Sequence, residues 1–481
     1  MTHDHPQPAT GAGDIWPQAV LDLLDAAGDR PVFEDGARVV GGAEMLSLIR
    51  RLAAGLSARG IGPGRGVILR LDVTPEAFAA TMAAFAVGAR VANIPPSLTP
   101  GQLADLLSRD DAVLISTADL PDLLATRPAD GPLLAAGRPA DIARITYTSG
   151  STGKPKGCAQ TYAAVSAGWN AHPNRWPSPL RALAPRLQRY LIFGSLSSLV
   201  MTEFGILALA AGGTLVVAHQ PSLRDAFVQH RATASVITVG KLNRLVRDQR
   251  TDPVDLSSLG ALMVAGSPLE PGRLREALDV LGPVIFHGYG QTEVGVISMV
   301  TPAEMASVPA VLASVGRPPP EVDVQLRDGE LYVRTPSQAS CYWDDPAETA
   351  EVFVDGWVRT RDLATVGPDG YLRLLGRARD VIIVNAQLIY AGPIELALAS
   401  HPDVAEAYVV GRPDDETGEA IHAFVVPADD RTPDAAVLRK VVTEELGESA
   451  APRTVTLIDQ PPLTPTGKPD KRALPVPAQR P

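Results

Sequence analysis

The stretch Ile145-Thr-Tyr-Thr-Ser-Gly-Ser-Thr-Gly-Lys-Pro-Lys-Gly157 carries more information on the fold than any other part of the chain. A β-like run leads into three glycines, two serines, two threonines and two lysines within ten residues. Glycines let a backbone approach a phosphate closely, hydroxyl and N–H groups donate to its oxygens, and lysines neutralise its charge. The stretch is no Walker loop, because position 148 is threonine and Lys154 is followed by Pro155. We therefore predict a phosphate-binding loop of a different kind, with a polar surface turn as the alternative.

Strands and helices alternate on both sides of this loop. Gly66–Leu71 and Ala89–Ile94 are strand-like, and Pro75–Val87 between them has a helical pattern. Such alternation predicts an α/β fold with largely parallel sheets. Between 322 and 375 the pattern changes to short strands joined by Asp-Gly turns, which predicts a β-rich, hairpin-containing end. The same patterns predict strands at 234–239, 261–264 and 283–286, and helices at 241–250 and 271–281.

A separate unit of about a hundred residues, enough to fold alone, begins after the charged segment Gly376–Asp380. Its mixture of strands and helices predicts an α+β fold. We therefore expect two domains: a large N-terminal domain, residues 1–377, of mixed α/β sheets with a β-rich end, and a small C-terminal domain, residues 378–481. The polar residues 1–13 are expected to form a flexible tail and not a signal peptide.

The composition excludes several classes of protein. The chain has 481 residues, with 54 acidic against 43 basic side chains and a formal net charge of −11. This acidic balance, without a long basic run, argues against nucleic acid and against a membrane surface as partners. The two cysteines, Cys158 and Cys341, are too few for a disulfide scaffold or a cysteine-built metal site, and they fit a reducing cytosol. We therefore expect a cytoplasmic globular protein, in which Cys158 is a packing residue.

One apolar segment, residues 191–218, is long enough to span a bilayer and contains a single charged residue, Glu203. Its two ends are β-like, whereas its middle, Leu199–Ala211, has the pattern of a buried helix ended by Gly212 and Gly213. A strand, a helix and a strand in a globular core are therefore the favoured prediction, and a membrane span is the alternative.

Two further motifs carry chemistry. His287-Gly-Tyr-Gly-Gln-Thr-Glu293 comes directly after the predicted strand 284–286, and ligands gather at the carboxyl ends of strands in α/β sheets. Its glycine-flanked aromatic can stack on a base, and its Thr-Glu pair offers a hydroxyl to a phosphate and a carboxylate to a hard cation. Near the C-terminus, Pro462-Leu-Thr-Pro-Thr-Gly-Lys468 places a lysine in a loop, a pattern that alone indicates only a surface charge.

Together these motifs resemble those of the adenylate-forming superfamily, which includes acyl-CoA synthetases, luciferases and nonribosomal adenylation domains. Thr148–Gly157 is similar, position for position, to the family's Thr-Ser-Gly-Ser/Thr-Thr-Gly-x-Pro-Lys-Gly loop, and Tyr289–Glu293 to its Tyr-Gly-x-Thr-Glu segment. Arg359–Leu363 resembles the Arg-Thr-Gly-Asp-Leu segment whose aspartate holds the ribose hydroxyls. The motifs occur in the same order as in the family, and the resemblance extends from about Leu23 to Leu474.

The resemblance implies AMP-forming chemistry, in which a carboxylate oxygen attacks the α-phosphorus of ATP and pyrophosphate leaves. Glu293 would hold Mg²⁺, Thr292 would orient the α-phosphate, and Lys468 of the small domain would bridge the carboxylate and the α-phosphate. Arg379 matches the hinge between the family's two domains. The residues that the resemblance assigns to ATP or AMP are Thr148, Ser149, Gly150, Ser151, Thr152, Gly153, Lys154, Lys156, Gly266, Ser267, His287, Gly288, Tyr289, Gly290, Asp362 and Arg377.

Three positions are expected to line the family's acyl pocket. By spacing from the glycine pair, Ser197 falls where acyl-CoA ligases carry histidine, and Leu199 where amino-acid-activating domains carry an aspartate. A free α-amino acid is therefore a poor substrate. Glu203 follows Leu199 by one helical turn, and a carboxylate in an apolar helix is costly unless paired. Either it pairs with a core arginine or a backbone group, or it recognises an amino or hydroxyl substituent of the acid.

Several residues depart from the family's pattern or leave two interpretations open. Arg361 replaces the glycine that usually precedes the ribose aspartate, and Ala386 replaces a glycine beside the incoming pantetheine. These changes, with Ala391 and Pro393, indicate either family drift or an acceptor other than free CoA. His287 either donates to the adenine edge or is a satisfied core histidine.

The sequence therefore predicts an ATP-dependent ligase that forms an acyl-AMP and transfers the acyl group to CoA. The expected acid is aryl or short, with a polar substituent. An adenylating enzyme that transfers to a carrier protein, an amine or another nucleophile is the first alternative. A non-catalytic nucleotide-binding protein is the second, and the intact set of Thr292, Glu293, Asp362 and Lys468 argues against it.

Overall fold

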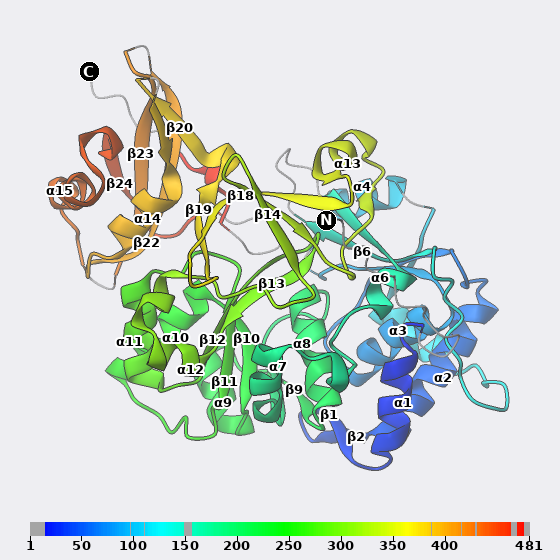
Figure 1. Cartoon of the computed structure of the whole chain (residues 1–481). Helices are drawn as coiled ribbons and strands as arrows, with labels where there is room; N and C mark the ends of the chain where they lie inside the picture. The colour runs from blue at the N-terminus through cyan, green and yellow to red at the C-terminus, as the bar shows by residue number, and fades with distance from the viewer. Residues whose placement is uncertain are drawn as a thin grey trace.

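The computed structural model describes residues 15–96, 98–109, 111–148, 156–385, 387–414, 416–428, 431–462 and 469–475. These residues form four β-sheets with helices around them. Figure 1 shows the last of the sheets, with its own helices, at one end of the molecule. A mixed α/β body with a β-rich segment and a smaller C-terminal α+β unit confirms the predicted fold class.

The phosphate-loop motif lies on a six-stranded sheet of order β16-β7-β6-β4-β3-β5. Strands β5, β3, β4 and β6 run parallel, and β7 turns back antiparallel to β6. Helix α3 (Pro75–Ala86) connects β3 to β4, and it begins where the Thr74 side chain accepts a hydrogen bond from the Ala77 N–H. The strands are β3 (Gly66–Arg70), β4 (Arg90–Asn93), β5 (Val113–Ser116), β6 (Ile142–Thr148), β7 (Lys156–Thr161) and β16 (Cys341–Trp343).

An eight-stranded sheet of order β13-β12-β11-β10-β8-β9-β1-β2 forms the other half of the large body. Residues 191–218 form the end of β8, helix α8 (Leu199–Ala210) and β9, as predicted. In the part of the chain that the structure describes, no helix is both long and apolar enough to cross a membrane. The strands are β1 (Pro31–Asp35), β2 (Arg38–Gly41), β8 (Arg189–Ile192), β9 (Thr214–Val217), β10 (Ala234–Thr238), β11 (Ala261–Ala265), β12 (Ile285–Gln291) and β13 (Gly295–Val300), with helices α9 (Leu223–His230), α10 (Val239–Thr251), α11 (Pro271–Leu281) and α12 (Pro302–Ser307).

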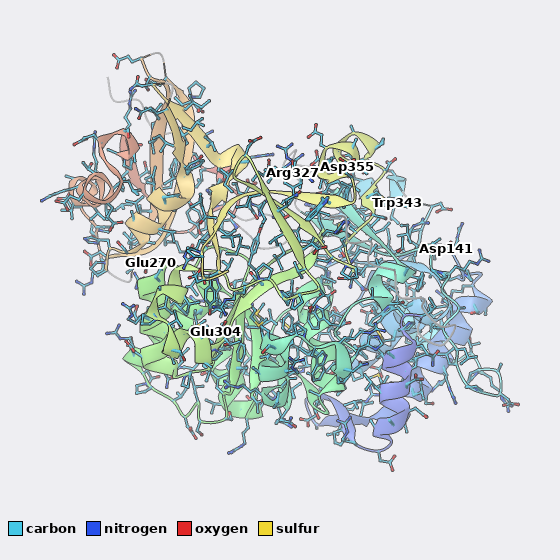
Figure 2. The ribbon with its side chains drawn as sticks, in the orientation of Figure 1. Asp141, Glu270, Glu304, Arg327, Trp343 and Asp355 are labelled. Atoms are coloured by element: carbon cyan, nitrogen blue, oxygen red, sulfur yellow. The ribbon has the colours of Figure 1, made fainter. Side chains whose placement is uncertain are left out.

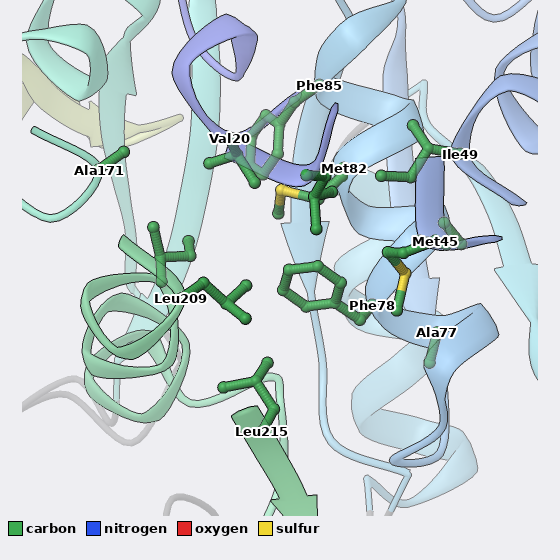
Figure 3. Close-up of a cluster of buried hydrophobic side chains, with 14 of the residues drawn as sticks. Val20, Met45, Ile49, Ala77, Phe78, Met82, Phe85, Ala171, Leu209 and Leu215 are labelled. Carbon is green, nitrogen blue, oxygen red and sulfur yellow. The ribbon is translucent and has the colours of Figure 1, made fainter. Parts of the chain in front are cut away.

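A hydrophobic core holds the two large sheets together where α3 and α8 meet. Phe78 of α3 points toward Leu209 of α8 and Leu215 of β9 (Figure 3), and its ring centroid lies 6.1 Å from that of Phe33. Burial of one such side chain contributes about 1.5–3 kcal/mol. This packing fixes α8 against the β6 sheet. Further helices complete the body: α1 (Gln18–Ala27), α2 (Gly42–Ala58), α4 (Pro100–Arg109), α5 (Leu120–Leu124), α6 (Tyr162–Ser166) and α7 (Ser178–Leu183).

The β-rich end is a five-stranded sheet of order β14-β15-β18-β17, with β19 paired to β18. Two of its predicted Asp-Gly turns have positive φ at both residues, 51° and 79° at Asp328-Gly329 and 52° and 78° at Asp355-Gly356 (Figure 2 labels Asp355). Such turns match the twist of the strands that they join. The elements are β14 (Asp323–Arg327), β15 (Glu330–Arg334), α13 (Pro346–Val352), β17 (Phe353–Val354), β18 (Trp357–Val366) and β19 (Leu372–Arg377).

The C-terminal unit has its own sheet, β21-β20-β23-β22 with β24 on β23, and its own buried cluster. The short helical turn Ala378–Asp380 separates it from β19. One contact to the large body is a hydrogen bond of 2.5 Å from Arg273 Nη2 to the Val404 carbonyl. The elements are β20 (Val381–Val384), β21 (Gln387–Tyr390), α14 (Ala391–Ala399), β22 (Val404–Asp414), β23 (Gly418–Pro427), α15 (Ala435–Leu446) and β24 (Thr454–Leu457).

Several element boundaries differ from the prediction, as at β12. Strand β12 does not end at residue 286 but continues to Gln291, because antiparallel pairing with β13 extends beyond its parallel pairing with β11 at His287. Helix α14 begins at Ala391, so Pro393 lies in its first turn. The proline is tolerated there because an N–H in the first turn has no acceptor within the helix.

Candidate active site

The predicted phosphate loop connects strands β6 and β7. Antiparallel pairing of these strands runs to Thr148 opposite Lys156, the described residues on either side of the loop. Thr148 therefore marks the carboxyl end of β6, the side of an α/β sheet where ligands gather. Outside the described residues lie the predicted positions Ser149, Gly150, Ser151, Thr152, Gly153, Lys154, Ala386 and Lys468, and also the side chains of Thr148 and Arg379.

Helix α13 holds Lys156 in place at the start of strand β7. Its Nζ lies 2.5 Å from Oε1 of Glu348 and 5.6 Å from the ring centroid of Tyr342. Its side chain is only 9% exposed. Glu348 lies in the first turn of α13, where its backbone N–H donates to the capping carboxylate of Asp345. The capped helix therefore presents a carboxylate to a phosphate-loop lysine.

Thr292 and Glu293 lie in the turn between β12 and β13, next to the phosphate-loop hairpin. The Thr292 carbonyl accepts a hydrogen bond of 3.5 Å from Cys158 Sγ on β7. The Tyr342 hydroxyl donates to Glu293 Oε1 at 2.6 Å, and burial, followed by the charge of Glu293, raises the pKa of Tyr342. Cys158 is buried, which raises the pKa of its thiol well above the ordinary value. Two motifs that are distant in the sequence thus meet around Tyr342.

The donor groups fit a magnesium ion that is held by one carboxylate. Within the described ranges, no group of three or more His, Cys, Asp or Glu residues is arranged to hold a metal. Mg²⁺ commonly binds through one or two carboxylates together with substrate phosphates and water. Glu293, in a turn beside the phosphate-loop hairpin, supplies one such carboxylate.

Asp362 is a buried carboxylate with three donors. Its Oδ2 accepts hydrogen bonds from the Tyr289 hydroxyl at 2.5 Å and from Gln291 Nε2 at 2.6 Å. Its Oδ1 lies 2.7 Å from Nε of Arg377. Tyr289 and Gln291 share one face of β12 because side chains alternate along a strand. Four residues from three strands therefore converge at the position that the sequence assigns to the ribose.

The remaining nucleotide candidates lie at the carboxyl end of β11 and along β12. Gly266 has φ of +100° and is exposed together with Ser267. An added Cβ at Gly290 would lie 2.3 Å from the backbone carbonyl oxygen of Gly295, so this position requires glycine, whereas one at Gly288 would lie 2.2 Å from the end of the flexible Met263 side chain. The chain can approach a flat base closely here.

His287 matches neither of its two predictions fully, which were a donor to the adenine edge and a core histidine with all its hydrogen bonds satisfied. It is 5% exposed, and its Nδ1 has no hydrogen-bond partner in the part of the chain that the structure describes. Burial lowers the pKa of the imidazole to about 4, against a smaller opposing effect of the Ser314 backbone. The ring is therefore neutral at physiological pH, and only part of its hydrogen-bonding capacity is used.

Ser197, Leu199 and Glu203 line one cavity between α3, β4, β6 and α8. Glu203 Oε1 lies 3.0 Å from Nη2 of Arg144, which projects from β6. Arg144 was not expected at the site, although a charged residue in the strand before the phosphate loop is a usable signal. The glutamate is therefore paired with an arginine inside the cavity wall.

The sequence patterns assign no role to several other polar residues near the site. Gln291 is inside a recognised motif but is assigned no role by it. Glu348 lies between Lys156 and Arg361, with its Oε1 2.8 Å from Arg361 Nη1. Near the turn Ala378–Asp380, Lys471 Nζ lies 2.6 Å from Glu395 and 3.1 Å from Asp380. These contacts arise from tertiary pairing, so local sequence patterns do not indicate them.

Comparison with known proteins identifies the class. Residues 24–343 match the family of AMP-binding enzymes, and residues 393–468 match the C-terminal domain of AMP-binding enzymes. The chain therefore belongs to the AMP-binding enzyme family, and it is an adenylate-forming ligase, as the sequence predicts.

Three similar proteins use different acceptors according to their names. An indoleacetate–CoA ligase from Aromatoleum aromaticum is 30% identical over 89% of this chain and 91% of its own length. A fatty acid–[acyl-carrier-protein] ligase from Streptomyces coeruleorubidus is 31% identical over 68% of this chain and 66% of its own length. The structure of the amide bond synthetase McbA from Marinactinospora thermotolerans has a TM-score of 0.83 and 33% identity, covering 94% of this chain and 98% of that one.

Proposed function

We propose that this ligase activates an aryl or short carboxylic acid with a polar substituent and transfers the acyl group to the thiol of CoA. The observation that carries the proposal is the convergence around Tyr342. There the phosphate-loop lysine, the Thr292-Glu293 turn and helix α13 are in contact. Strand β12, which leads into the Thr292-Glu293 turn, also carries Tyr289. The Tyr289 hydroxyl donates a hydrogen bond to the buried carboxylate of Asp362.

In the first half-reaction, an oxygen of the acid's carboxylate forms a bond to the α-phosphorus of ATP, and the bond to the bridging oxygen of pyrophosphate breaks. The phosphate-loop residues and Thr292 would orient the phosphates, and Asp362 would accept hydrogen bonds from the ribose hydroxyls. Lys468 would lie between the two reacting anions, and such positioned charge is usually the largest contribution to catalysis. Magnesium on Glu293 would offset phosphate charge.

The acid pocket supports a substrate that is neutral apart from its carboxylate. Because Arg144 neutralises Glu203, an ammonium group on the acid would have to compete with a guanidinium for the same carboxylate. The cavity wall also has the polar side chains of Thr81 and Asn93, between apolar residues such as Phe85. A ring with a hydroxyl or a neutral N–H group matches this mixture.

The preferred acceptor is CoA because a CoA ligase resembles the chain over nearly its full length. The second candidate is an amine, which would attack the acyl carbon and release AMP to form an amide. The observation that favours this candidate is the likeness to an amide bond synthetase, at 33% identity over 94% of the chain.

The domain division is part of the same proposal. Residues 1–377 would form the nucleotide-binding domain and residues 378–481 the mobile domain, with Arg379 at the hinge. The separate core of the C-terminal unit and the short helical turn Ala378–Asp380 support it.

ATP–pyrophosphate exchange over a panel of acids tests the first half-reaction. We expect exchange with hydroxylated or N–H-containing aryl acids and a loss of about a hundredfold or more in the K468A variant. Undiminished exchange in K468A would contradict the role of that lysine. Product masses after addition of CoA, a carrier protein or an amine then identify the acceptor.

A further inference from the structure

Arg361 has a backbone conformation that suits glycine. Its φ is +59°, in the left-handed region, between Thr360 and Asp362 on strand β18. A side chain in this region crowds the backbone and costs free energy. A glycine at this position would avoid that cost, so the arginine side chain is expected to provide a compensating interaction.

The Arg361 side chain makes two ion pairs to helix α13. Its Nη1 lies 2.8 Å from Oε1 of Glu348, and its Nη2 lies 2.9 Å from Oε2 of Glu351. Oε1 of Glu348 is also the atom that lies 2.5 Å from Nζ of Lys156. One carboxylate oxygen is thus shared by two cations, from strand β18 and from the base of the phosphate-loop hairpin.

The sharing matters because Glu348 is mostly removed from water. Its side chain is 15% exposed, and that of Lys156 is 9% exposed. Burial alone would raise the pKa of Glu348, but the hydrogen bonds from Lys156 and Arg361 outweigh it and lower the pKa. A buried carboxylate that loses its only cation is strongly destabilising. With Arg361 present, Glu348 keeps a partner when Lys156 moves.

We infer that Arg361 is a positioning residue that keeps Glu348 paired while Lys156 exchanges this carboxylate for phosphate oxygens of the nucleotide. The inference rests on the proposed nucleotide site. Without Arg361, Lys156 would be the main partner of Glu348, and ATP would have to break that pair. Arg361 therefore favours ATP binding without contact to the reacting atoms.

The variant R361G tests the side chain alone. It removes the two ion pairs without adding backbone strain, because glycine adopts φ of +59° readily. We expect the Kd and the KM for ATP to rise about fivefold to tenfold, with kcat of pyrophosphate exchange changed less than about twofold. The double variant R361G/E348Q removes the carboxylate that retains Lys156, and we expect its ATP affinity to return to within about twofold of wild type. D328G is the matched control, since it places glycine at a residue with φ of +51° in the β14–β15 turn.

A purely structural role for Arg361 predicts the opposite pattern. If it only fixes α13 to β18, E348Q would add to the defect of R361G, and this result, or an unchanged Kd in R361G, would overturn the inference. The Kd is measured without acid or acceptor. A weakened Kd that E348Q restores therefore supports the inference even in an enzyme that activates no acid of the panel, whereas that lack of exchange would count against the proposed function.

Discussion

Nη2 of Arg144 lies 3.0 Å from Oε1 of Glu203, within the wall of the cavity that Ser197 and Leu199 also line. The guanidinium is oriented further by two hydrogen bonds, of 2.9 and 2.6 Å, to Oε1 of Gln160. A cation from β6 thus compensates the carboxylate of α8, which explains how an apolar helix accommodates it. Because β6 leads directly into the predicted phosphate loop, the same strand connects the proposed acid pocket with the proposed nucleotide site.

Removal of Glu203 alone should leave a buried guanidinium without its counter-charge. We expect E203L to lower the free energy of unfolding by about 3 kcal/mol, whereas the double variant R144L/E203L should recover most of it. Both variants should lose their preference for acids with a hydroxyl or N–H substituent. Thermal melting and pyrophosphate exchange over the acid panel measure the two effects.

The pair of Arg189 and Glu34 provides the control, since its two hydrogen bonds, of 2.8 and 2.7 Å, lie away from the cavity. The double variant R189L/E34L should leave the acid preference unchanged. Equal turnover of substituted and unsubstituted acids by the wild type, unaffected by E203L, would refute a role of Glu203 in specificity.

Tyr342 should affect the magnesium requirement through Glu293. In Y342F the carboxylate loses a donor at 2.6 Å, so we expect a cost of about 1 kcal/mol in stability and a higher Mg²⁺ concentration for half-maximal exchange. The second effect follows because the hydroxyl orients the carboxylate that would hold the ion. Magnesium titrations of the exchange reaction measure it.

Y371F is the matched control, because the Tyr371 hydroxyl also donates to a glutamate, Glu304, at 3.0 Å. It removes the same kind of hydrogen bond away from the phosphate-loop hairpin. A magnesium requirement that shifts equally in Y371F and Y342F would show that the effect is one of general stability.

Much of this architecture follows from local patterns. Alternating apolar runs indicate the parallel sheets, and Asp328-Gly329 and Asp355-Gly356 indicate the hairpins, because their φ values depend on short-range chemistry. The end of β12 was not predicted, since pairing with β13 sets it. Arg144 and Glu348 were also missed as site residues. Their roles come from partners that are distant in the chain, and spacing along one segment contains no information on such pairs.

The pH dependence of stability should reveal the buried imidazole of His287. Its folded pKa of about 4 lies below the unfolded value of 6.5, so between these pH values the unfolded chain binds more protons. Stability is therefore fully present above pH 6.5 and is lost as the pH falls toward 4, by a total of about 3 kcal/mol. In H287Q this part of the pH dependence should disappear. Melting curves from pH 4.5 to 7.5 for both proteins measure the difference.

The matched substitution is H219Q, which changes an exposed histidine that pairs with Asp35 at 2.6 Å and leaves the buried ring in place. H219Q should keep the loss of stability toward pH 4 that the buried imidazole of His287 causes. Identical profiles for wild type and H287Q would mean that the imidazole is not held neutral by burial.

Lys471 should control how the C-terminal unit presents Lys468, the proposed adenylation lysine, three residues earlier in the chain. Its Nζ lies between the carboxylate of Glu395, whose side chain is 13% exposed, at 2.6 Å, and Asp380 at 3.1 Å. Burial raises the pKa of Glu395 despite the opposing charge of Lys471. In K471M this glutamate loses its cation, and we expect a loss of about 3 kcal/mol in the stability of the C-terminal unit.

The same substitution should lower kcat of pyrophosphate exchange with a smaller effect on the KM for ATP, because the proposed nucleotide contacts come from the large body. The Asp470 N–H donates to the Pro462 carbonyl at 2.7 Å. Lys471 therefore lies next to a hydrogen bond between described residues on either side of the segment 463–468, which contains Lys468. K471R should restore kcat, since it keeps the cation. K440M removes an exposed lysine of α15 that pairs with Glu444, and should leave kcat unchanged. A fall in melting temperature in K471M without a change in kcat would show that the anchor stabilises the unit but does not position its lysine.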